Sequence, residues 1–154
     1  KLNDALRESL PSLLKDFDII HLCGKGHKEE SLEGTKGYCQ FEYVTDGLAD
    51  LFAATDVIIA RAGSNSISEF LALKKPHLLI PLSAKASRGD QILNAASYEK
   101  QGFAMVLPEE ELTAATMEEK VRELYANRET YIAAMEKSTQ NNGVEAVMAL
   151  IRQF

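Results

Sequence analysis

The sequence is short of basic residues, of long apolar runs and of cysteine. Its 17 Lys and Arg stand against 23 Asp and Glu, which gives a net charge of −6. This balance argues against nucleic acid as a main partner, because phosphate backbones are bound by clusters of basic side chains. No apolar run approaches the roughly 20 residues that span a bilayer, and the first residues are polar rather than typical of a signal peptide. We therefore expect a soluble chain with neither a transmembrane segment nor a secretory leader.

Cys23 and Cys39 are the only cysteines, and their spacing matches no metal-ligand pattern. We expect reduced thiols in a reducing compartment, of which the cytoplasm is the simplest. The sequence has no repeats, no phosphate-loop spacing and no local Ser/His/Asp or Cys/His arrangement. We therefore expect no metal and no cofactor. His21 and His77 are expected to be structural, and residues 109–111 to form a solvated acidic turn.

Short apolar runs alternate with segments of helical periodicity along the 154 residues. That alternation is typical of an α/β domain with a Rossmann-like parallel sheet flanked by helices. The expected strands cover residues 17–23, 38–44, 57–60, 77–81 and 103–107. The expected helices cover residues 3–15, 46–52, 65–73, 90–101, a segment from 113 onward, 129–137 and 144–152. We expect Asp46 and Thr113 to cap helices, and Gly102 to end one.

The most informative stretch is residues 61–69, where a strand ends and a helix begins. Gly63, Ser64 and Asn65 lie at this turn, where free backbone N–H groups and the positive end of the helix dipole favour phosphate. Glu69 follows on the helix, and a carboxylate near a phosphate site is typically used to bind a ribose diol. We therefore predict a nucleotide or nucleotide-sugar site. The alternative is an ordinary helix capped by Ser64 or Asn65, with Glu69 solvated.

A second polar segment, residues 87–91, follows the next strand and again opens a helix. Because parallel strands end at one edge of their sheet, this segment is expected at the same rim as Gly63. Asp90 and Gln91 together offer acceptors and donors suited to several sugar hydroxyls. The alternative is that Asp90 is simply the N-cap of the helix.

Residues 63–69 and 89–95 together resemble the donor site of GT-B glycosyltransferases. The intervening residues 70–82 narrow the resemblance to the C-terminal domain of the lipid II-forming N-acetylglucosaminyltransferases of glycosyltransferase family 28, in their Gram-positive form. Residues 21–26 and 41–44 share the resemblance, which runs from Lys1 to about Leu112.

The resemblance implies a role for each matched residue in binding UDP-N-acetylglucosamine. It places Glu69 on the ribose hydroxyls and the backbone of Val44 on the uracil. It sets Gly63, Ser64 and Asn65 beside the diphosphate, and Asp90 and Gln91 on the sugar hydroxyls. Asp90 departs from the glutamine pair of some members. Two arginines, Arg61 and Arg88, are implied either as phosphate neighbours or as partners in salt bridges at the rim.

The resemblance also implies a two-domain enzyme, of which residues 1–154 are a single UDP-sugar-binding domain. Its other domain binds the lipid-linked acceptor, lipid I, at the cytoplasmic face of the membrane and supplies the general base. We therefore expect no catalytic residue in this chain. The chain is expected to lack the first strand of its sheet with the Gly-rich loop, and to bind donor weakly without turnover. The reaction implied is an inverting, metal-free transfer that serves peptidoglycan synthesis, cell shape and cell division.

Three other functions remain open at this point. One is the donor domain of a diacylglycerol glucosyltransferase, which would prefer UDP-glucose. Another is a non-catalytic UDP-sugar-binding subunit of a split glycosyltransferase. The third is a nucleotide-sugar epimerase, for which 154 residues leave little room.

Overall fold

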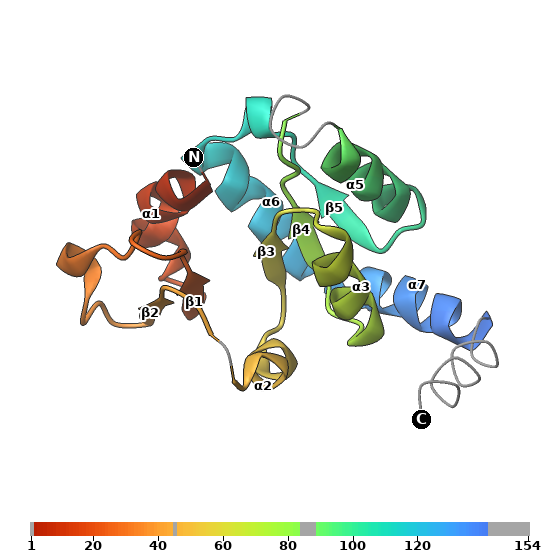
Figure 1. The fold of residues 1–154 in the computed structure, drawn as a ribbon, viewed down its shortest axis with the longest axis horizontal. Coiled ribbons are helices and arrows are strands. Elements are labelled where there is room, and N and C mark those ends of the chain that lie inside the picture. The colour runs from red at the N-terminus through yellow and green to blue at the C-terminus, as the bar shows by residue number, and fades with distance from the viewer. Residues whose placement is uncertain (1, 45, 84–88, 142–154) are drawn as a thin grey trace.

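The computed structural model describes residues 2–44, 46–83 and 89–141 (Figure 1). Five short strands alternate with helices, as the sequence predicts. The strands are β1 (Ile19–Leu22), β2 (Tyr38–Phe41), β3 (Ile58–Ala60), β4 (His77–Leu79) and β5 (Ala104–Val106). The α-helices are α1 (Leu2–Leu13), α2 (Leu48–Ala54), α3 (Ser64–Ala72), α5 (Asp90–Lys100), α6 (Ala114–Ala126) and α7 (Arg128–Asn141). Two 3-10 turns are η1 (Glu30–Leu32) and η2 (Glu109–Glu111). The helix expected over 144–152 lies outside the described residues.

All the strand pairs are parallel, which confirms the predicted direction of the sheet. The strands pair in two groups, however: β1 with β2, and β3, β4 and β5 in that order. In the first group Ile19 pairs with Tyr38, and in the second Ile58 pairs with His77. The sequence did not predict this division, because periodicity along a strand does not identify its neighbours.

The three-stranded group is buried on both faces. Alternate residues of β4 pack on opposite layers: Leu78 joins the cluster of α1 and α6, and Leu79 joins that of α3 and α5. In β3, likewise, Ile59 packs on the first cluster and Ile58 lies in the second. This period of two places helices over both faces of the sheet, and α1 packs directly against α6.

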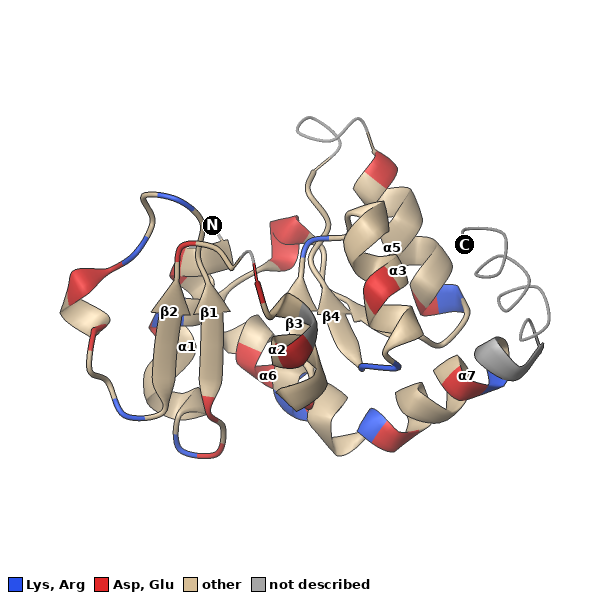
Figure 2. Ribbon diagram, turned by 60° about the horizontal axis from the view of Figure 1, so that its bottom comes forward, with Lys and Arg blue, Asp and Glu red and all other residues tan. Residues whose placement is uncertain are grey.

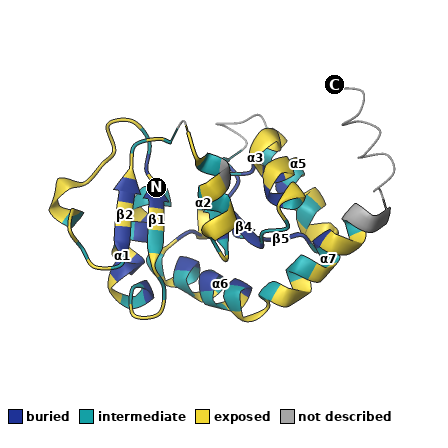
Figure 3. Ribbon diagram, turned by 90° about the horizontal axis from the view of Figure 1, so that it is seen from below, coloured by how far each residue is buried: buried dark blue, intermediate teal, exposed yellow. Residues whose placement is uncertain are grey.

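In the two-stranded group the covered face is polar and the open face is apolar. His21, Tyr38 and Gln40 are buried on its α1 side, whereas Ile20 and Phe41 on the other face are 47% and 44% exposed. Buried and exposed residues accordingly alternate along β2 (Figure 3). The covered face is therefore polar and must be held by hydrogen bonds, because buried polar groups without partners are costly.

Helix ends follow the predicted capping only in part. Thr113 caps α6 in a capping box with Thr116, and Gly102 ends α5 at a φ of 81°, both as predicted. Asp46 does not cap α2, because Gly47 occupies the N-cap position with a left-handed backbone. At the end of α3 the left-handed position falls to Lys74, with a φ of 56°.

Candidate functional site

The predicted rim lies where β3 and β4 end. The strands carry no Lys, Arg, Asp or Glu, and the charged residues occupy the helices and loops around them (Figure 2). Arg61 to Gly63 lead from β3 into α3, and Ile80 to Ser83 follow β4. Because the strands run parallel, both loops emerge at the same edge of the sheet. The backbone N–H of Ile80 donates to the carbonyl of Ala60 over 2.9 Å, which keeps the loops adjacent.

Helix α3 begins without a side-chain cap. Gly63 is its N-cap residue, in an extended conformation, and Ser64 and Asn65 are exposed residues of its first turn. The alternative in which Ser64 or Asn65 caps the helix is therefore wrong. Apart from Gly63 itself and its two neighbours in the chain, no described residue has an atom within 4 Å of the position that a Cβ on Gly63 would take. The first-turn N–H groups have no side-chain cap and lie at the positive end of the helix dipole, which suits an anion.

Helix α5 begins beside this turn. Its N-cap is Gly89, at a φ of 86°, and Asp90 is the exposed first residue of the helix. The alternative in which Asp90 is the N-cap is therefore wrong as well. The Asp90 carboxylate makes no hydrogen bond that caps the helix.

Gln91 joins the two loops of the rim. Its Oε1 accepts hydrogen bonds from the backbone N–H groups of Ala62, over 3.3 Å, and Leu82, over 2.9 Å. One turn later Asn94 donates from Nδ2 to the carbonyl of Ala62 over 3.0 Å. Sequence reasoning missed Asn94; its spacing of three from Gln91 on one helix face was the available signal. The Gln91 amide thus uses its oxygen within the protein and keeps its NH2 group as a donor.

Arg61 is held by the protein. Its Nη2 lies 3.0 Å from Oε1 of Glu109, and its Nη1 donates to the carbonyl of Ile80 over 3.1 Å. The other oxygen of Glu109 accepts from the backbone N–H of Ser83 over 3.3 Å. Arg61 therefore has the salt bridge that the sequence left as one of two readings. For Glu109 the predicted solvated turn is wrong, since its side chain is only 18% exposed.

Glu69 and Val44 take no part in the hydrogen bonds that link the two loops of the rim. Glu69 is exposed on α3, and its side chain has no hydrogen bond or ion pair with another described residue. Val44 is half-buried, in the segment that follows β2. Arg88 lies outside the described residues. The structure thus brings Ala62, Gly63 and Gln91 together, and leaves Glu69 exposed and Val44 half-buried outside this group.

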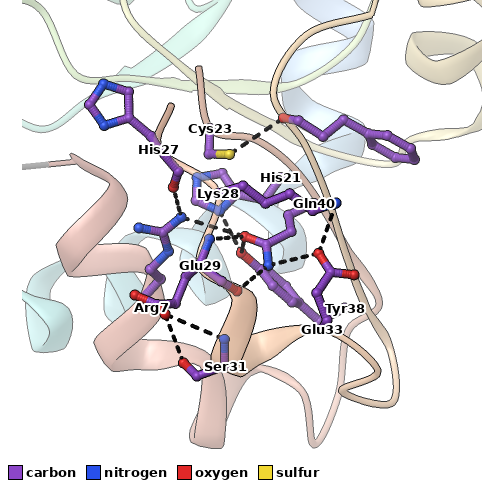
Figure 4. A network of polar contacts seen from close by, with 11 residues as sticks. Arg7, His21, Cys23, His27, Lys28, Glu29, Ser31, Glu33, Tyr38 and Gln40 are labelled. Carbon is purple, nitrogen blue, oxygen red and sulfur yellow. Dashed lines mark hydrogen bonds and ion pairs between the residues drawn. The ribbon is translucent and has the colours of Figure 1, made fainter. Parts of the chain in front are cut away.

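A polar layer, which includes Arg7, His21, Tyr38 and Gln40, lies between α1 and the paired strands β1 and β2 (Figure 4). His21 is held on both ring nitrogens: Nδ1 is 2.7 Å from the Tyr38 hydroxyl, and Nε2 is 2.9 Å from Oδ1 of Asn3. Asn3 also donates from Nδ2 to the carbonyl of Cys23 over 2.9 Å, which fixes the amide so that its oxygen faces His21. Nε2 of His21 therefore carries a proton and donates it to Oδ1 of Asn3. Burial, and then the charge of Arg7, lower the pKa of His21 to about 4.

His77, the first residue of β4, is buried in the three-stranded group between Phe70 and Tyr98. The ring centroids lie 5.2 Å from that of Phe70 and 5.8 Å from that of Tyr98. Nδ1 lies 2.8 Å from the carbonyl of Lys75 and must donate to it, whereas Nε2 has no hydrogen-bond partner among the described residues. Burial lowers the pKa of His77 to about 4. Both histidines are structural, as predicted.

Neither a metal centre nor a membrane span is found in the described part of the chain. No group of three or more His, Cys, Asp or Glu side chains in residues 2–44, 46–83 and 89–141 could hold a metal ion. Over the same residues, no helix has the length and apolar character to cross a bilayer.

Close relatives carry the name UDP-N-acetylglucosamine–N-acetylmuramyl-(pentapeptide) pyrophosphoryl-undecaprenol N-acetylglucosamine transferase. The protein of that name from Lachnospira eligens is 56% identical over 151 residues, which are 98% of this chain and 43% of the relative. The one from Geobacillus thermodenitrificans is 55% identical over 152 residues, 99% of this chain and 43% of the relative. The chain thus spans less than half the length of these relatives.

Solved structures show the same fold at lower identity. The glycosyltransferase of kitacinnamycin superposes with a TM-score of 0.75 at 20% identity, over 99% of this chain and 39% of that one. MurG of Acinetobacter baumannii superposes with a TM-score of 0.69 at 24% identity, over 98% of this chain and 46% of that one. These likenesses establish the GT-B type of fold.

The family described as glycosyltransferase family 28 C-terminal domain matches residues 1–151. The match includes the uncapped start of α3, the loop after β4 and the start of α5, where the predicted donor site lies. With relatives of 54–56% identity over nearly all its residues, the chain belongs to glycosyltransferase family 28, as a C-terminal domain of that family.

Proposed function

We propose that residues 1–154 are the UDP-N-acetylglucosamine-binding domain of an inverting transferase that adds N-acetylglucosamine to undecaprenyl-pyrophosphoryl-MurNAc-pentapeptide. The observation that carries the proposal is 56% identity, over 151 residues, to a relative named for this transfer. The reaction converts lipid I to lipid II in peptidoglycan synthesis. The rim geometry is consistent with it, because the helix that starts at Gly63 has no side-chain cap.

The diphosphate of UDP binds at the start of α3 in this proposal. The N–H groups of Ser64 and Asn65 donate to phosphate oxygens, and the helix dipole favours their charge. The same groups stabilise the negative charge that develops on UDP as the acceptor hydroxyl displaces it. Arg61 contributes mainly by holding the rim, because its guanidinium is already paired with Glu109.

The remaining contacts with the donor are assigned to residues around the diphosphate site at the start of α3. Glu69, exposed on α3, binds the ribose hydroxyls, and the backbone of Val44 binds the uracil. Asp90 accepts from sugar hydroxyls. Gln91 donates to the sugar through Nε2, since its Oε1 already accepts from Ala62 and Leu82.

The acceptor and the general base belong to a second domain in this proposal. The relatives are more than twice as long as this chain, which spans 43% of the L. eligens protein. That domain binds lipid I and brings the enzyme to the cytoplasmic face of the membrane. Residues 1–154 alone are then expected to show no transfer to a lipid I analogue.

We also propose that a further parallel strand lies between β1 and β3. In the described residues β1 pairs only with β2, and β3 pairs on one side only, with β4. Ile19 of β1 and Ile59 of β3 both pack on the cluster of α1 and α6, so the two strands face one helical layer. One strand between them would complete a single sheet, and its following loop would reach the rim beside Gly63.

The test is a calorimetric titration of the chain with UDP-N-acetylglucosamine, UDP-glucose, UDP-galactose and UDP. Preference for UDP-N-acetylglucosamine is expected. Preference for UDP-glucose would assign the domain to glycolipid synthesis instead. If residues 1–154 bind none of the four, the titration is repeated on a chain extended at its amino end by a strand and Gly-rich loop. If the extended chain also binds none of the four ligands, the proposal is overturned.

A further inference from the structure

A groove lies between α5 and the segment that follows β5. Its first wall is a stripe of α5 formed by Ile92, Ala96 and Glu99, whose spacing places them on one face of the helix. Gln91 and Asn94, the residues of α5 that bond to the rim, lie on another face. The groove is therefore a separate surface of the helix, outside the predicted donor site.

The second wall is formed by the end of β5 and the turn η2. Val106 and Pro108 line it together with Glu110, and Pro81 of the loop after β4 closes one end. Among the described residues β5 has β4 as its only strand neighbour. The groove thus lies at the outer edge of the three-stranded group.

The lining combines apolar side chains with charges of one sign. It contains three glutamates, and no Lys or Arg is among the described residues that form it. Glu109 is paired with Arg61, whereas Glu99 and Glu110 are exposed and have no ion pair with another described residue. Unpaired carboxylates beside an apolar surface give a negative potential there, which favours a cationic partner.

Exposure and size indicate what kind of partner fits. Ile92 is 42% exposed, its neighbour Leu93 is 70% exposed, and neither belongs to the buried clusters of the domain. Adjacent apolar side chains left open beside a groove are typical of an interaction surface. The groove holds about 190 Å³, which is less than the roughly 300 Å³ at which small-molecule pockets begin. It suits the anchoring side chains of a protein better than a whole small ligand.

We propose that this groove docks a basic amphipathic segment of a partner protein. Aliphatic side chains of the segment pack on Ile92 and Val106, and its lysine or arginine groups lie beside Glu99 and Glu110. An anionic membrane surface is excluded as the occupant by the same two carboxylates, which would repel it.

The test is a titration of the chain with a model peptide at low ionic strength, followed by calorimetry and by backbone amide chemical shifts. The peptide consists of two Leu-Lys-Lys-Leu-Leu-Lys-Leu heptads, which form a basic amphipathic helix. A second peptide carries glutamate in place of every lysine. The lysine peptide should bind and shift the amides of α5 and η2, and the glutamate peptide should not bind.

Charge reversal tests the two free carboxylates. Glu99→Lys combined with Glu110→Lys should raise the dissociation constant of the lysine peptide about tenfold, because attraction is replaced by repulsion. The matched control combines Glu8→Lys on α1 with Glu119→Lys on α6, both at exposed positions. It changes the net charge of the chain equally and should raise the dissociation constant by less than about twofold.

Ile92→Ser tests the apolar wall and should raise the dissociation constant about fivefold. Leu73→Ser is its control, since Leu73 is 37% exposed at the end of α3, away from the groove. This control should have no effect on peptide binding. Urea denaturation of each variant shows that it is folded.

Four results would overturn the proposal. The lysine peptide could fail to bind, or the groove and control charge reversals could weaken it equally, which would show attraction to net charge alone. The chain could instead self-associate through the groove, in which case Glu99→Lys with Glu110→Lys would abolish a dimer seen by analytical ultracentrifugation. Lastly, a chain extended by the proposed second domain could lose the peptide, which would make that domain the occupant.

Discussion

Glu109 and Arg61 form an ion pair that ties the turn after β5 to the end of β3. Oε1 and Nη2 lie 3.0 Å apart, and the side chains are 18% and 27% exposed, respectively. Through the Ile80 carbonyl, 3.1 Å from Nη1, the same guanidinium reaches the end of β4. Arg61 thus links the ends of β3, β4 and β5, and we infer that it stabilises the loops of the rim.

Arg61→Ala is expected to lower the free energy of unfolding by about 1.5–3 kcal/mol, the range for hydrogen bonds to charged groups. In a double-variant cycle with Glu109→Ala, the coupling should be about 0.5–3 kcal/mol, measured by urea denaturation. The control cycle uses Lys28 and Glu33, whose ion pair is 42% and 50% exposed and should couple by less than about 1 kcal/mol. If the losses in free energy of unfolding for the Arg61 and Glu109 variants are strictly additive, the ion pair does not stabilise the rim.

Glu69→Gln is expected to weaken UDP binding by about 1.5–3 kcal/mol, because it removes the charged acceptor assigned to the ribose hydroxyls. The penalty should shrink with 2′-deoxy-UDP, which lacks one of these hydroxyls. Glu119→Gln, at an exposed position on α6, is the control and should have no effect. An unchanged dissociation constant for UDP in Glu69→Gln would remove Glu69 from the site.

The two buried histidines should make the chain less stable in weak acid. Their folded pKa values are about 4, below the ordinary value of 6.5, so the unfolded chain takes up protons first as the pH falls. Stability is therefore complete above about pH 6.5 and is lost toward pH 4, with a slope of up to about 1.4 kcal/mol per pH unit for each histidine.

His77→Phe should remove about half of that slope while keeping an aromatic ring beside Phe70 and Tyr98. The measurement is urea denaturation at a series of pH values between 4 and 7. A slope that is the same in His77→Phe and the unaltered chain would contradict a neutral, buried His77.

Lys74→Gly should stabilise the chain. Lys74 ends α3 at a φ of 56°, where its N–H donates to the Leu71 carbonyl over 3.1 Å. A side chain is strained in this left-handed conformation and glycine is not, so we expect a gain of about 0.5–1 kcal/mol. Thermal denaturation measures it. Ala72→Gly, inside the same helix, should lower the stability of the chain. If Lys74→Gly lowers the stability as well, the strain assigned to Lys74 is refuted.

The sequence predicts the strands and most of the helices because apolar runs and helical periodicity are local. The helix starts were harder. Ser64 and Asp90 are preferred N-cap types, yet Gly63 and Gly89 take the N-cap positions in the fold. Capping preference ranks residue types, whereas the start of a helix depends on how the preceding loop leaves its strand.

Long-range partners could not be predicted at all. The pairing of Arg61 with Glu109 spans 48 positions, and the bond from Asn94 to Ala62 spans 32. Neither follows from a motif, since each depends on where separate loops meet in three dimensions. Gln91 was predicted as a sugar ligand from its residue type, and its second task, as an acceptor for two backbone groups, emerged only from the fold.

The polar layer between α1 and the strands β1 and β2 determines how the strands are aligned with the helix, in addition to holding them together. Apolar surfaces tolerate sliding, but hydrogen bonds act along set directions, and His21 meets Asn3 and Tyr38 at once in only one alignment. Sliding β1 by one residue would turn Ile20 toward α1 and carry the imidazole to the open face. The hydrogen bonds of His21 therefore fix the register of β1 against α1, because they are lost when the strand is shifted by one residue.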